Sequence, residues 1–137
     1  MEAAEPYGFN QLDDCVASCL LVAAHQHITF DLVILLQVHG TEDATVSYTT
    51  DGIQQGAEVS QATWADRNGC TGTLDAIGTG NYTTDTDEID TDLFAYGGCP
   101  AGGAVQLWRM NDIGHIPIIT DDWRRDVFEF FVNNPKP

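Results

Sequence analysis

Asp43 and His115 are the two residues whose types and settings suit acid–base chemistry. Residues 33–48 read VILLQVHGTEDATVSY, an apolar run that stops at His39 and Gly40 and opens into a polar loop with Asp43. Residues 104–110 alternate like a strand, and a Gly-His loop with His115 follows them. Loops at the carboxyl ends of parallel strands meet at one edge of a sheet. Asp43 would then accept the proton on one ring nitrogen of His115 and leave the other nitrogen free as a base.

Each residue alone also has a simpler explanation. Aspartate is common in turns, so Asp43 would only cap one. A lone histidine in a Gly-Pro loop is more often a surface residue than a base. The pairing of the two loops is what favours a catalytic interpretation.

Four phrases resemble a known family in the same order. Residues 39–48 (HGTEDATVSY) resemble the acid-bearing loop of the esterase and polyhydroxybutyrate depolymerase branch of the α/β-hydrolases, which is similar to feruloyl esterases. The other three phrases are TWADRNGC at 63–70, GGCP at 97–100 and the Gly-His loop. The resemblance covers residues 33–133, the carboxyl-terminal part of a typical enzyme of this branch.

The resemblance implies an α/β fold, here a truncated hydrolase-like sheet with flanking helices. It makes Asp43 the acid and His115 the base of a Ser-His-Asp triad that hydrolyses short acyl esters without a cofactor. It also implies a disulfide between Cys70 and Cys99, and therefore a secreted or periplasmic protein whose leader has been removed.

The nucleophile is missing from its expected place. A Gly-x-Ser-x-Gly elbow should precede the acid, and none occurs. Ser18 is the only serine before Asp43, and it lies inside a predicted helix. A helix serine usually bonds its own backbone, and Cys19 is a still weaker candidate. Three sources remain: Ser18, a serine supplied across a dimer, or a water activated by His115.

The sequence pattern predicts the elements that position these residues. We expect a strand buried on both faces at 32–39 and a helix at 57–68 that Gly69 ends. The segment 71–92 reads as a solvated loop or an edge hairpin, and 104–110 as a strand. The remaining predictions are a loose arm at 1–9, a helix at 12–26, and a last helix beginning at Thr120 whose stripe of Trp123, Val127, Phe130 and Phe131 is core.

Composition indicates one globular domain spanning residues 1–137. The net charge of -16 argues against nucleic acid and anionic membranes as partners and suits saline surroundings. No run of 18 apolar residues occurs, so no membrane span is expected. Cys15 and Cys19 read as small buried side chains, and no second cysteine or histidine pair stands at the spacing a zinc site would need.

Two alternatives to an esterase, and one prediction about assembly, follow. A non-catalytic remnant or binding module of the same fold would explain the missing elbow. A calcium-dependent adhesion domain would use the carboxylates of residues 83–92, although their spacing is not that of an EF-hand. The strands that would flank 33–39 are missing, so we expect an open apolar edge that a second copy covers, giving a homodimer.

Overall fold

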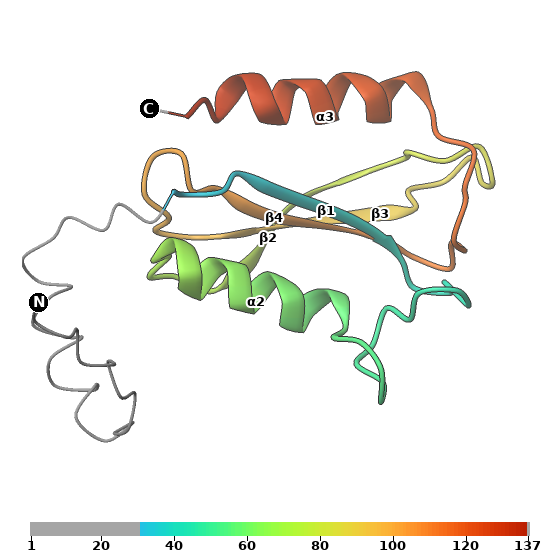
Figure 1. The fold of residues 1–137 in the computed structure, drawn as a ribbon. Helices are drawn as coiled ribbons and strands as arrows, with labels where there is room; N and C mark the ends of the chain where they lie inside the picture. Colours follow the sequence, from blue (N-terminus) through green and yellow to red (C-terminus); the bar gives the residue numbers. More distant parts are fainter. Residues whose placement is uncertain (1–30, 137) are drawn as a thin grey trace, which may run out of the picture. The chain divides into compact units, whose positions relative to one another are not determined.

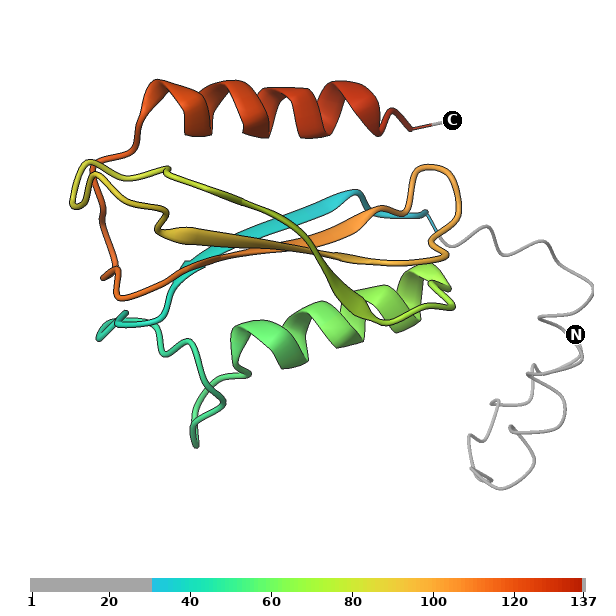
Figure 2. The same cartoon turned by 180° about the vertical axis from the view of Figure 1, so that it is seen from behind.

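Two parallel strands carry the loops of Asp43 and His115. A computed structural model describes residues 31–136. In it β1 (Leu35–Gly40) pairs with β4 (Val105–Met110) in parallel, from Leu35 opposite Val105 to Gly40 opposite Met110. The carboxyl ends of both strands therefore lie side by side at one end of the sheet. The sheet is mixed, with strand order β1-β4-β3-β2, and α2 and α3 cover opposite faces, so the α/β class is confirmed (Figure 1 and, from behind, Figure 2).

The segment 71–92 contains both expected features, an edge hairpin and a connecting loop in which Asp85, Asp87 and Glu88 are exposed. Strands β2 (Leu74–Gly80) and β3 (Thr91–Tyr96) are antiparallel, and β3 also pairs with β4. Asp90 is 3% exposed. Its carboxylate accepts hydrogen bonds from the backbone N–H groups of Tyr82 and Thr83 and from the hydroxyl groups of Thr83 and Thr91. Both carboxylate oxygens of Asp90, in the segment considered for calcium, therefore already accept hydrogen bonds from protein groups. Within residues 31–136, no three acidic, histidine or cysteine side chains are grouped to hold a metal ion.

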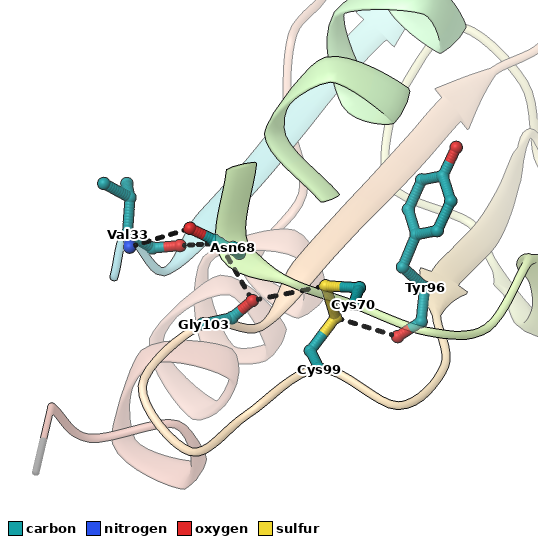
Figure 3. The surroundings of a disulfide bond; sticks show 6 residues. All are labelled: Val33, Asn68, Cys70, Tyr96, Cys99 and Gly103. Carbon is teal, nitrogen blue, oxygen red and sulfur yellow. Dashed lines mark hydrogen bonds between the residues drawn. A yellow bond between two sulfur atoms is a disulfide. The ribbon is translucent and has the colours of Figure 1, made fainter. Parts of the chain in front are cut away.

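Helix α2 (Ala57–Asn68) has the bounds that the sequence predicts. Gly69 ends it in the left-handed region with φ 73°, where a residue without Cβ has no steric penalty. The last residue, Asn68, is 3% exposed. Its amide donates to the carbonyls of Val33 and Gly103, and its Oδ1 accepts from Val33 N–H (Figure 3). One side chain thus fastens the segments that lead into β1 and β4.

The expected disulfide between Cys70 and Cys99 is present beside Asn68 (Figure 3). It joins the residue after Gly69 to the turn that follows β3 and precedes β4. The Asn-Gly-Cys phrase therefore stabilises the end of the sheet where β4 begins, and His115 follows the other end of β4.

Helix α3 (Asp121–Asn133) begins as predicted, because Thr120 Oγ1 accepts a hydrogen bond from Trp123 N–H. Trp123 and Val127 pack against a buried cluster that includes Trp108. Phe130 is buried, but Phe131 is 49% exposed. The prediction that Phe131 is core was wrong, since the helix turns that side chain away from the sheet.

Strand β1 lies at an edge of the described sheet and pairs only with β4. The residues from Leu35 to His39 are half-buried, so the prediction of a strand buried on both faces was wrong. The open edge itself is as expected. No helix within residues 31–136 is long and apolar enough to cross a membrane. The predicted arm at 1–9 and helix at 12–26 lie outside the described residues, so the prediction of a single domain for the whole chain stays untested.

Candidate active site

Close backbone packing brings the two predicted loops together. At Gly40, the last residue of β1, an added Cβ would lie 2.2 Å from the carbonyl oxygen of Ile113. Only glycine permits this approach. Thr41 N–H then donates to Met110 O at 2.9 Å and Glu42 N–H donates to Ile113 O at 3.0 Å. The Asp43 loop therefore lies against the loop of His115.

Asp43 and His115 form the pair that the sequence predicts. Asp43 Oδ2 lies 2.8 Å from His115 Nδ1. Asp43 Oδ1 accepts the backbone N–H groups of Thr45 and Val46, each at 2.8 Å. The carboxylate thus also caps its own turn, as the simpler explanation had it, and each of its oxygens has a separate role.

The surroundings of Asp43 keep it ionised. Its side chain is 5% exposed, and this burial alone would raise the pKa. The hydrogen bonds from His115, Val46 and Thr45 outweigh burial and lower the pKa to about 2, from an ordinary value of 3.8. A charged acceptor at this position selects the tautomer of His115 with the proton on Nδ1.

His115 presents its second nitrogen to a cavity. Its side chain is 42% exposed, and Nε2 has no hydrogen-bond partner among residues 31–136. With Nδ1–H held by Asp43, Nε2 carries a lone pair. His115 is therefore arranged as a general base that is open to a ligand.

The cavity beside His115 has a volume of about 430 Å³, within the usual range for small-molecule sites. Its walls are mostly apolar. They include Val38 of β1, Met110 of β4, Trp123 of α3 and Ile119. The ionisable side chains in the lining are His39, Asp43 and His115. Such a wall suits an uncharged apolar group placed beside a base.

No hydroxyl or thiol group of the described residues lines this cavity. Ser18 and Cys19, the candidate nucleophiles, lie outside the described residues. Within residues 31–136 the site therefore has an acid and a base but no attacking side chain. Cys70 and Cys99 supply no nucleophile, because their sulfur atoms are joined to each other and neither residue lines the cavity.

His39 also belongs to the site, although the expected pair of Asp43 and His115 does not include it. Its Nε2 lies 2.9 Å from Val46 O and 3.4 Å from Asp43 Oδ2. The signal was present in the sequence. Gln37 and His39 are polar residues two apart in an apolar strand, so they share one face of it.

Comparisons of the chain with protein-family models, with curated proteins and with solved structures find no match.

Proposed function

We propose that this protein is a small carboxylic-ester hydrolase acting on short acyl esters. The single observation that carries the proposal is the 2.8 Å contact between Asp43 Oδ2 and His115 Nδ1 at the wall of an apolar cavity. In the proposed reaction, His115 Nε2 takes the proton from an attacking hydroxyl and returns it to the leaving alkoxide. Asp43 stabilises the imidazolium that exists between these two steps.

The order of the elements supports the likeness to an α/β-hydrolase. The acid follows one parallel strand and the histidine follows its neighbour, in the chain order acid then histidine. The fold is then a truncated version of that sheet, with β1 at the edge where further strands would continue. A disulfide supports a secreted or periplasmic location, because disulfides persist in oxidising compartments.

Three sources for the attacking oxygen remain within the proposal. Ser18 and a serine from a second copy would each give an acyl-enzyme intermediate. A water activated by His115 would give direct hydrolysis at a lower rate, because general base catalysis alone contributes about 10² to 10⁴-fold.

The test is hydrolysis of a short-chain nitrophenyl ester by the purified full chain. Parent, His115→Ala and Ser18→Ala proteins are compared with Ile118→Ala, which removes an exposed side chain from the His115 loop. We expect His115→Ala to abolish turnover and Ile118→Ala to retain it. Loss with Ser18→Ala identifies the nucleophile, and retention assigns it to another chain or to water. A parent without turnover, or one unaffected by His115→Ala, contradicts the proposal.

A second candidate function is a non-catalytic binding module with the same apolar cavity. The observation that favours it is the lack of a hydroxyl or thiol group in the lining contributed by residues 31–136. This module would bind an apolar ester without releasing acid or alcohol. An inactive parent that still binds the ester would establish it.

We also propose a homodimer formed across the open edge of β1. An edge strand presents unpaired backbone N–H and C=O groups, and a second β1 would pair with them. The net charge of -16 opposes association, so we expect the dimer fraction to rise with salt. Light scattering at micromolar concentration measures it, and a monomeric mass at both low and high salt contradicts the dimer.

A further inference from the structure

His39 is a residue of β1, and its ring contacts the Asp43 loop at Val46 O. Its side chain is 10% exposed, at the last position but one of β1. The ring edge packs against Tyr48, with ring centroids 5.5 Å apart and planes at 79°. Tyr48 is itself held by a hydrogen bond from its hydroxyl to Glu58 on α2. The ring of His39 therefore has a defined place and orientation.

The partners of His39 decide which nitrogen carries its proton. Val46 O, 2.9 Å from Nε2, is a carbonyl and can only accept, so Nε2 must donate. Nε2 also lies 3.4 Å from Asp43 Oδ2, but the hydrogen bond of that oxygen is the one to His115. Nδ1 then has a lone pair, and the atom facing it is the amide nitrogen of Gln37 at 3.4 Å.

A buried amide on α2 orients Gln37. Gln61 is fully buried, and its Nε2 donates to Gln37 Oε1 at 2.9 Å. This bond turns the amide nitrogen of Gln37 toward His39. The Oε1 of Gln61 has no hydrogen-bond partner in the described part of the chain. Among these residues, the bond to Gln37 is therefore the only hydrogen bond that the side chain of Gln61 makes. A chain of three contacts therefore runs from Gln61, on the buried side of α2, through Gln37 and His39 to the acid loop.

We infer that His39 is a positioning residue, whose Nε2–H holds the acid loop at Val46 O and thereby keeps Asp43 Oδ2 beside His115. The inference deepens the proposed function, on which it rests for its catalytic meaning. Without His39, the loop keeps the hydrogen bonds within residues 43–46 but loses this tie to β1. Asp43 would then hold His115 in one tautomer and one orientation for a smaller fraction of the time.

The test follows the proton between His115 Nδ1 and Asp43 by NMR on the full chain labelled with ¹⁵N-histidine. His39→Phe keeps an aromatic ring but removes both nitrogens. His39→Gln places an amide N–H near the former Nε2. We expect exchange of the His115 Nδ1 proton with water to rise about fivefold in His39→Phe, the factor for one lost hydrogen bond between uncharged groups. His39→Gln should restore the slow exchange, and His115→Ala identifies the signal by its loss.

Ester turnover gives the second measurement. We expect kcat to fall about fivefold in His39→Phe, by more than KM changes, and to recover in His39→Gln, because the ring acts on turnover through the Asp43 loop although it also lines the cavity. Parent-like proton exchange in a folded His39→Phe protein overturns the inference. So does a His39→Gln protein that is as impaired as His39→Phe, since a role in packing alone would give that result.

Two further results keep the inference separate from the proposed function. If His39→Phe does not fold, the double variant Gln37→Met with Gln61→Met removes the partner of His39 Nδ1 without leaving either glutamine unpaired. Faster exchange of the His115 proton in that variant supports the inference, and unchanged exchange overturns it. If the parent hydrolyses no ester while the NMR pattern holds, the proposed function fails and the positioning role of His39 stands.

Discussion

Replacing Asp43 with asparagine is expected to lower kcat for ester hydrolysis by about 10³ to 10⁴-fold, the range seen when a triad acid becomes an amide. The amide oxygen would still accept from Thr45 and Val46, as Asp43 Oδ1 does at 2.8 Å. The amide nitrogen would then face His115 Nδ1 and His39 Nε2–H. A donor in that place forces the proton of His115 onto Nε2, and a protonated Nε2 is no base.

Asp112→Asn is the matched control for this effect. Asp112 lies in the loop between β4 and His115, is exposed, and has φ 59°, which asparagine also tolerates. Its replacement removes one negative charge near the site but none of the contacts of Asp43. We expect kcat within about twofold of the parent, since exposed charges are screened by salt. Equal losses in the two variants would show that general charge, and not the tautomer of His115, controls turnover.

The same pair of variants tests the ionisation of Asp43 through stability. The pKa of Asp43 is lowered to about 2 in the folded chain, so its contribution to the free energy of unfolding is present above the ordinary value of 3.8. That contribution is lost as the pH falls toward about 2. We expect the stability difference between parent and Asp43→Asn to shrink over this interval, as measured by urea unfolding. A difference that stays constant from pH 5 to about 2 would contradict the lowered pKa.

The second large effect concerns stability and not turnover. Replacing Cys70 and Cys99 together by serine is expected to lower the free energy of unfolding by about 3 to 4 kcal/mol, the loop-entropy value for a separation of 29 residues. Such a loss is a large part of the total stability of a small domain. Urea unfolding of parent and variant, at one pH and salt concentration, measures it.

The controls for the disulfide separate stability from catalysis. Parent protein treated with a thiol reductant should unfold at the urea concentration of the double variant. The folded fraction of the variant should retain the parental kcat, because the disulfide precedes β4 and His115 follows it. A loss below 1 kcal/mol would show that the Asn68 contacts, which tie the same segments, suffice without the disulfide.

Local sequence signals predicted the elements whose ends depend on their own residues. Helix α2 runs from Ala57 to Asn68 because Gly69 supplies a left-handed stop, and α3 begins at Thr120 because that side chain caps it. The pairing of Asp43 with His115 followed from two loops placed after two strands. It needed only that the strands be parallel neighbours, which β1 and β4 are.

Only the tertiary structure decided which surfaces are covered and which side chains meet. The apolar run of β1 read as buried on both faces, yet burial of a strand depends on neighbours far away in the sequence, and among residues 31–136 β1 has one neighbouring strand. Phe131 shares the apolar pattern of α3 but faces solvent. The contact between Gln61 and Gln37 joins residues 24 positions apart, so no local period reveals it. The spacing of two between Gln37 and His39 is a local signal that places them on one face of β1. The sequence alone therefore predicted the pairing of Asp43 with His115 and the elements that carry them, whereas packing of α2 on the sheet determined how the Asp43 loop is held.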